Sequence, residues 1–204
     1  MARIFSVVTK AGLSRILDPV ARVLLRAGVS PDAVTVAGTA GVVVAAIVLA
    51  TRGRLIAATL VITACALLDV LDGAMARLSG RSSRFGALLD STMDRVADAA
   101  VFGALVYWLA MRGRHATAVA ALLSLVLGFL VSYVKARAEG LGLRADVGIA
   151  ERFERLLVIG LGGLAYGFGV PYALEVALWL LVVLSTVTVA QRMVHVYRLD
   201  RGAG

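Results

Sequence analysis

Residues 69–94 read DVLDGAMARLSGRSSRFGALLDSTMD, and four acids of this stretch lie in or beside two long apolar segments. Asp69 and Asp72 are three residues apart, and Asp90 and Asp94 are four apart, so each pair shares one face of a helix. A carboxylate inside a membrane span is costly unless a partner offsets the loss of water. Four carboxylates at helical spacing therefore predict a bound divalent cation between two helices.

The composition places these acids in a membrane protein. Of the 204 residues 60% are hydrophobic, and the mean hydropathy is +0.91. These values predict an all-α integral membrane fold. A span needs roughly 20 mostly apolar residues. Six segments are predicted to cross the bilayer: 33–52, 55–78, 86–111, 116–138, 153–169 and 172–197.

The N-terminal residues differ from the six apolar segments because charges recur every few positions. We expect residues 1–28 to form an amphipathic interfacial helix segment, with Val20 and Val23 toward lipid and Arg15 and Arg22 toward headgroups. Residues 29–199 are then a six-helix bundle. Because no linker or repeat interrupts the chain, we expect residues 1–204 to form a single membrane domain.

The net charge of +8 is unevenly distributed. Seventeen of the 21 Lys and Arg residues fall at the two termini and at the second and fourth loops with their flanks. The positive-inside rule then places both termini and the acidic stretch at the cytoplasmic face of the plasma membrane. Because these charges cap membrane helices, they do not indicate a nucleic-acid partner.

Carboxylate oxygens are ligands for hard cations such as Mg²⁺ or Mn²⁺. Four carboxylates can hold two ions about 3.5–4 Å apart, an arrangement used in phosphoryl displacement. Salt bridges to Arg77, Arg84 and Arg95 are an alternative, but they account for only one or two of the acids. A metal-ion transporter is a second alternative. It would need polar groups further across the membrane, where Glu175 is the one acid that the other spans offer.

The eight fixed positions of D-x2-D-G-x2-A-R-x8-G-x3-D-x3-D, residues 69–94, match the signature of the CDP-alcohol phosphotransferases, which the whole chain resembles. The resemblance implies that Asp69 and Asp90 bridge two metal ions. Asp72 would hold one ion and Asp94 the other, and Asp94 would also be the general base. It further implies contacts with the CDP donor from Asp32, Ala33, Val34, Thr35, Gly73, Arg77 and Ser83.

The acceptor has to be selected elsewhere, because the motif is shared across acceptors. Basic residues gather at the ends of the last three spans, and we expect them to form a pocket for a phosphorylated alcohol beside the metal site. Residues 132–156, SYVKARAEGLGLRADVGIAERFERL, resemble the actinobacterial phosphatidylinositol-phosphate synthases of this family. That resemblance implies CDP-diacylglycerol as donor, inositol 3-phosphate as acceptor, and a homodimer in lipid. The candidate acceptor-phosphate residues are Ser132, Lys135, Arg137, Arg155 and Arg192. Glycerol 3-phosphate, the acceptor of a phosphatidylglycerophosphate synthase, is the alternative.

Overall fold

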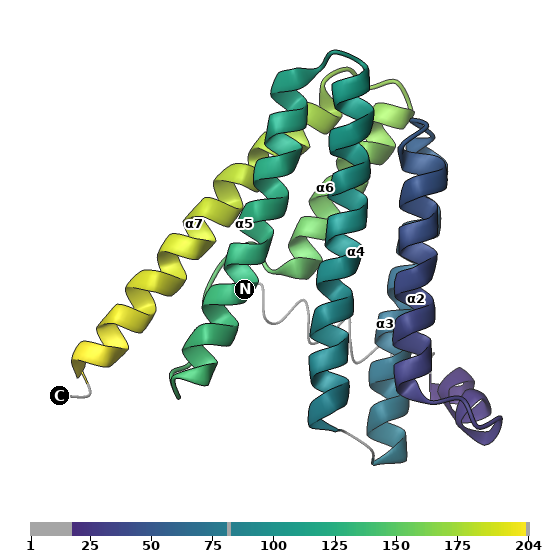
Figure 1. Cartoon of the computed structure of the whole chain (residues 1–204), viewed down its shortest axis with the longest axis vertical. Coiled ribbons are helices and arrows are strands. Elements are labelled where there is room, and N and C mark those ends of the chain that lie inside the picture. The colour runs from purple at the N-terminus through teal and green to yellow at the C-terminus, as the bar shows by residue number, and fades with distance from the viewer. Residues whose placement is uncertain (1–17, 81–82, 203–204) are drawn as a thin grey trace. The chain divides into compact units, whose positions relative to one another are not determined.

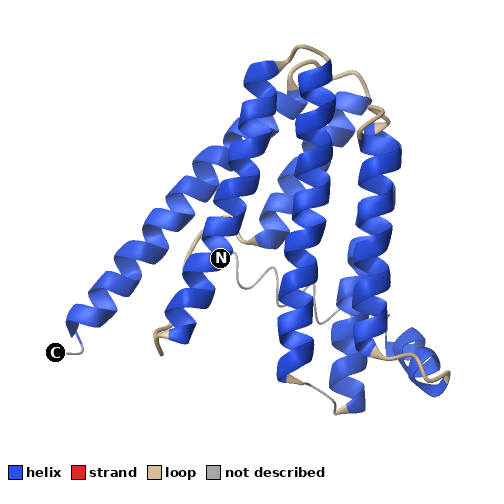
Figure 2. Cartoon of the chain, viewed as in Figure 1, coloured by secondary structure: helices blue, strands red, loops and turns tan. Residues whose placement is uncertain are grey.

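A computed structural model describes residues 18–80 and 83–202, and within them every regular element is a helix (Figure 2). Residues 18–26 are helical and precede α2 (Pro31–Ala45), which continues as a π-helical turn, η1 (Ala46–Ala50). The remaining helices are α3 (Leu55–Ser79), α4 (Arg84–Met111), α5 (His115–Gly140), α6 (Arg152–Gly167) and α7 (Ala173–Gly202) (Figure 1). The all-helical prediction is confirmed, and most helix ends lie within two residues of those predicted.

Among the described residues, four helices are long and apolar enough to cross a membrane: Pro31–Ala50, Leu55–Ser79, His115–Gly140 and Ala173–Arg201. The protein is therefore a multi-pass membrane protein. Helix α6 has only 16 residues, about 24 Å at 1.5 Å per residue. In α4 the acidic residues occupy the first half, so that the uncharged run begins only after Asp98. The six-span arrangement consequently stays a prediction.

The chain divides into two compact units. The described part of the first unit comprises residues 18–50, 57–80 and 83–101, and that of the second comprises residues 51–56 and 102–202. The boundary falls inside α4, whose first two-thirds belong to the first unit. The prediction of a single domain is not tested by this division.

The first unit is built on α2, α3 and the beginning of α4. Ser30 caps α2 by accepting a hydrogen bond from Ala33 N at 3.2 Å, and Pro31 fills the first turn. A Cβ on Gly38 of α2 would lie 3.3 Å from Cys65 O and from Leu68 Cβ, so glycine allows α2 and α3 to approach closely.

The helix at residues 18–26 also packs in the first unit. Ala21 is fully buried in a cluster with Leu71 and Met75 of α3, while Val20 and Val23 are exposed. Exposure of these two residues agrees with the predicted lipid-facing side. Residues 1–17, the larger part of the predicted interfacial segment, lie outside the described residues.

In the second unit, α7 packs along both α5 and α6. Its core joins Phe102 and Leu109 of α4 to Leu178 and Leu181 of α7. A Cβ on Gly162 of α6 would lie 2.4 Å from Ala177 Cβ, so the helices meet at a small residue. Glu175 pairs with Arg114, which also lies over the Tyr166 ring. This ion pair gives Glu175 a structural role and weakens the transporter alternative.

The turn between η1 and α3 generates a stability prediction. Gly53 has φ +72°, and a Cβ there would lie 2.4 Å from Trp108 Nε1. The Trp108 ring is 4% exposed and packs edge-on against Tyr166, so it has little room to move. Gly113 has nearly the same φ, +71°, but no heavy atom within 4 Å of a Cβ.

We therefore expect Gly53→Ala to destabilise the protein by about 1–3 kcal/mol more than Gly113→Ala, because only the former adds a clash to the backbone strain. Thermal unfolding of the two variants in one detergent measures the difference. Equal losses would show that Trp108 yields without cost.

Candidate active site

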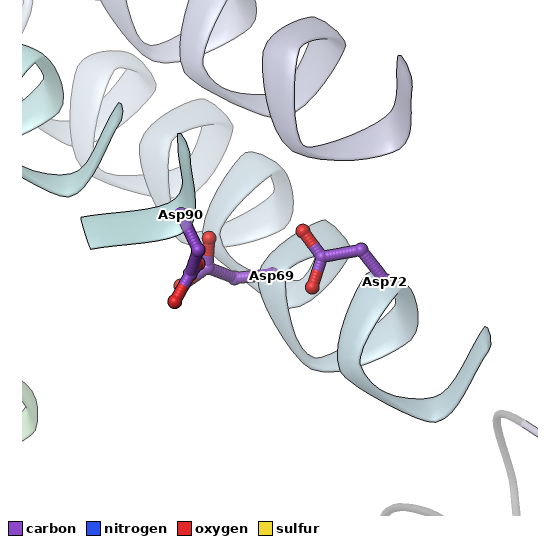
Figure 3. A group of neighbouring side chains, drawn as sticks. All are labelled: Asp69, Asp72 and Asp90. Carbon is purple, nitrogen blue, oxygen red and sulfur yellow. The ribbon is translucent and has the colours of Figure 1, made fainter. Parts of the chain in front are cut away.

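Three of the four acids converge where α3 ends and α4 begins. Asp69, Asp72 and Asp90 each offer a carboxylate oxygen, and these oxygens lie within 4.8 Å of one another. Figure 3 shows Asp69 and Asp72 on successive turns of α3, with Asp90 reaching the same point from α4. The structure thus brings together three of the four predicted acids, all within the first unit.

The electrostatics of this group favour a cation. Two like charges about 5 Å apart repel by on the order of 3 kcal/mol at an effective dielectric constant of about 20. Asp72 is only 7% exposed, so water screens its carboxylate poorly. Carboxylates from two helices at this spacing fit a hard divalent cation, and the three residues together form a candidate divalent-metal site.

Asp94 lies one turn beyond Asp90 on α4 and stands outside the group of three. It is half-buried, and its Oδ1 atom is inaccessible to water. Its place on the same helix face as Asp90 is the one that the spacing predicts. Its roles as metal ligand and general base are not tested by this arrangement.

Thr35 of α2 positions one of the carboxylates. Its hydroxyl donates a hydrogen bond to Asp72 Oδ2, and it also lies 3.2 Å from Pro31 O. Both Thr35 and Asp72 are buried. The family resemblance implies that Thr35 contacts the CDP donor, and the structure places its hydroxyl directly against a candidate metal ligand.

Other residues predicted to bind the CDP donor lie beside two glycines, Gly86 and Gly73. Ser83 Oγ accepts a hydrogen bond from Gly86 N at 2.8 Å. A Cβ on Gly86 would lie 3.1 Å from Ser83 Oγ and 3.3 Å from Asp32 Oδ1, so Gly86 brings the starts of α2 and α4 together.

The second glycine lies on α3. A Cβ on Gly73 would lie 3.5 Å from Arg77 Nη1, so the guanidinium lies over the glycine face. Of the remaining donor-binding candidates, Val34 is buried in the core of the unit and Ala33 is exposed.

The predicted acceptor residues all lie in the second unit, and three of them meet at the turn of α5 formed by residues 128–132. The Arg155 guanidinium crosses α5 at Gly128, where a Cβ would lie 3.2 Å from its Nε. Ser132 Oγ donates to Gly128 O at 3.2 Å, and Arg192 Nη1 donates to Val131 O at 2.6 Å. The structure therefore brings Ser132, Arg155 and Arg192 together, although they come from three helices.

Arg155 and Arg192 are each 2% exposed, which is unusual for arginine. Arg192 also donates to Val147 O at 2.8 Å and to Glu151 Oε1 at 3.3 Å. Lys135, one turn beyond Ser132, pairs with Asp146 at 2.8 Å. Arg137 is exposed on the last turn of α5.

The basic cluster (Ser132, Lys135, Arg155 and Arg192) also contacts Asp146, Glu151 and Gly128, which the sequence pattern did not indicate. Two of them are acids beside predicted basic residues in the stretch 132–156, and that alternation of charge was the available signal. Gly128 has no comparable signal, because its contact is with a residue on another helix.

The profile of the CDP-alcohol phosphatidyltransferase family matches residues 28–190. The chain belongs to this family of enzymes. Among its relatives, the phosphatidylinositol phosphate synthase of Mycobacteroides abscessus is 50% identical over 192 residues, which is 93% of this chain and 87% of the relative. The Streptomyces avermitilis protein of the same name is 46% identical over 198 residues, which is 93% of this chain and 81% of that protein.

Solved structures of this family resemble the fold closely. The phosphatidylinositol phosphate synthase of Mycobacterium tuberculosis with CDP-DAG bound aligns with a TM-score of 0.85 and 47% identity, covering 90% of this chain and 94% of that one. The same enzyme in complex with manganese and citrate aligns with a TM-score of 0.84 and 45% identity, covering 89% and 88% respectively.

The Thr35–Asp72 hydrogen bond predicts an effect on metal affinity. We expect Thr35→Val to weaken Mn²⁺ binding roughly tenfold, because a carboxylate that loses its orienting partner is a poorer ligand. Thr35→Ser keeps the hydroxyl and should bind as the wild type does. Mn²⁺ titration of the substrate-free protein, followed by electron paramagnetic resonance, measures both. Equal affinities for wild type and Thr35→Val would refute the positioning role.

Proposed function

We propose that this enzyme transfers the phosphatidyl group from CDP-diacylglycerol to inositol 3-phosphate, giving phosphatidylinositol phosphate and CMP. The convergence of Asp69, Asp72 and Asp90 within 4.8 Å carries the proposal, since it supplies the metal site that this chemistry needs. Similarity to named phosphatidylinositol phosphate synthases over more than nine-tenths of the chain supports the choice of product.

The proposed cofactor is a pair of Mg²⁺ ions, with Mn²⁺ as a substitute. Asp69 and Asp90 would bridge the pair, Asp72 would complete one site and Asp94 the other. The manganese complex of the Mycobacterium tuberculosis enzyme supports a divalent metal in this family. When bound, the ions would supply charge neutralisation for the pyrophosphate and for the departing CMP.

The chain's own residues would orient the donor and move one proton. Asp32, Ala33, Val34, Thr35, Gly73, Arg77 and Ser83 would hold the CDP moiety. Asp94 would accept the proton of the acceptor hydroxyl as that oxygen attacks the phosphorus bearing the diacylglycerol. The bond from that phosphorus to CMP then breaks.

Ser132, Lys135, Arg137, Arg155 and Arg192 would bind the acceptor phosphate. Three observations support this assignment: Ser132, Arg155 and Arg192 meet at one turn of α5, both arginines are buried, and the cluster is basic. Buried guanidinium groups are well suited to a dianionic phosphate because their planar fork matches two of its oxygens.

The membrane arrangement is proposed as well. Six helices would span the plasma membrane, with α4 and α6 completing the four spans supported by length and composition. Both termini and the acidic group would face the cytoplasm, as the distribution of Lys and Arg indicates. The chain would act as a homodimer and as one domain per protomer.

Glycerol 3-phosphate is the second candidate acceptor, because a basic pocket accepts any small phosphorylated alcohol. Release of CMP by purified protein with CDP-diacylglycerol and Mg²⁺ separates the candidates. Activity with inositol 3-phosphate, but not with free inositol or glycerol 3-phosphate, is the expected result. Activity with glycerol 3-phosphate alone would keep the reaction and overturn the acceptor.

The general base generates one prediction. Asp94→Asn should lower turnover by about 10²–10⁴-fold, because the amide cannot accept the proton. Affinity for CDP-diacylglycerol should change little. Asp200→Asn, which alters an exposed carboxylate at the end of α7, serves as the control. Near-normal turnover of Asp94→Asn would exclude Asp94 as the base.

The phosphate pocket generates another prediction. Lys135→Ala should raise the acceptor KM by about tenfold or more, because a charge-assisted hydrogen bond is lost. The donor KM should stay close to the wild-type value. Arg144→Ala removes an exposed charge from the same region and should leave both constants unchanged. If Lys135→Ala raised both KM values equally, it would not belong to an acceptor pocket.

A further inference from the structure

The connection between α5 and α6, residues 141–151, contains no helix, yet parts of it are deeply buried in the second unit. Ala145 and Ala150 are both 0% exposed. A buried loop must find partners for its backbone N–H and C=O groups. Two side chains of α7 act as such partners: Thr188 for the N–H groups of residues 149 and 150, and Arg192 for the carbonyl of residue 147.

Thr188 makes three hydrogen bonds through one hydroxyl. It accepts from Ala150 N at 3.0 Å and from Ile149 N at 3.3 Å, and it donates to Leu184 O at 2.8 Å. A hydroxyl has one donor and two acceptor positions, so all three are in use. The side chain is 0% exposed, and water has no access to replace these bonds.

Gly148 independently indicates a close fit at the same point. Its φ is +131°, which side chains rarely adopt. A Cβ there would lie 2.5 Å from Thr188 Cγ2. The connection thus lies directly against both the methyl and the hydroxyl of Thr188.

The residues held in this way carry the partners of the basic cluster. Asp146, two residues before Gly148, pairs with Lys135. Glu151, next to Ala150, is the N-cap residue that precedes α6, and it receives a hydrogen bond from Arg192. Arg155 follows one turn into α6, and its backbone N–H donates to Glu151 O at 3.1 Å.

We propose that Thr188 is a positioning residue for the acceptor site. By holding residues 148–150 against α7, its hydroxyl fixes Asp146 opposite Lys135 and sets the start of α6, from which Arg155 reaches α5. The ligand class is a small phosphorylated alcohol. The identity of that ligand rests on the proposed function, whereas the contacts of Thr188 are observed independently of it.

Thr188→Val keeps the shape of the side chain and removes the hydroxyl. We expect amide hydrogen exchange at Ile149 and Ala150 to accelerate about tenfold, and the acceptor KM to rise by about the same factor. The donor KM and the Mn²⁺ affinity should not change, because the metal ligands lie in the first unit. Thr188→Ser keeps the hydroxyl and should restore both readouts.

Two glycines of the connection give a second route if Thr188→Val does not fold. Gly148→Ala should raise the acceptor KM, because the new methyl group pushes the connection away from Thr188. The control is a second glycine of the connection, Gly142, which also has a positive φ, +77°, but no heavy atom within 4 Å of a Cβ. Gly142→Ala is therefore expected to leave the acceptor KM unchanged.

Unchanged exchange at Ile149 and Ala150 in Thr188→Val, or equal increases in donor and acceptor KM, would overturn the inference. If the wild type used no phosphorylated alcohol, the proposed function would fail. Hydrogen exchange and calorimetric binding of inorganic phosphate would still decide the role of Thr188. Weaker phosphate binding by Thr188→Val than by the wild type would support the positioning role. Equal phosphate binding by the two proteins would overturn that role.

Discussion

The mutual repulsion of Asp69, Asp72 and Asp90 is the constraint around which the first unit is organised. Two acids come from α3 and one from α4, and their oxygens lie within 4.8 Å. Such a group is stable only when a cation or hydrogen-bond donors offset the like charges. Thr35 provides one such donor from α2, so that α2, α3 and α4 all contribute to the same group. Chemistry and packing are coupled here, because any change in the pairing of α2, α3 and α4 moves a carboxylate.

The basic cluster of the second unit contains buried positive charge, and oxygen atoms of the protein itself offset that charge. Arg192 is buried, and its guanidinium donates to two backbone carbonyls and one carboxylate. Burial of an unpaired charge is strongly unfavourable, and these oxygens replace the water that arginine loses. The result is a positive group held rigidly before any ligand arrives. Preorganisation of this kind lowers the entropic cost of binding an anion.

The sequence predicts those features that depend on local periodicity. Long apolar runs separated by short polar turns give the bounds of α3, α4 and α5. The three-residue spacing puts Asp69 and Asp72 on one face of α3, and the short connection to α4 allows Asp90 to lie near them. Contacts between distant segments leave no such pattern. Nothing in the neighbourhood of Thr188 indicates that its hydroxyl binds backbone groups 38 and 39 residues earlier. The hydrogen bond from Thr35 to Asp72 is another contact that the sequence does not indicate, because the two residues lie 37 positions apart.

The distribution of candidate residues between the two units bears on how acceptor choice can vary within the family. The predicted metal ligands and the residues predicted to bind the CDP donor all lie in the first unit, whereas the predicted acceptor residues all lie in the second. The acidic signature is the part that family members with different acceptors share. A change in the connection between α5 and α6, or in its contacts with α7, alters the basic cluster without altering a predicted metal ligand. The proposed assignments therefore predict that substitutions in the second unit change the acceptor while the candidate metal site of the first unit is kept.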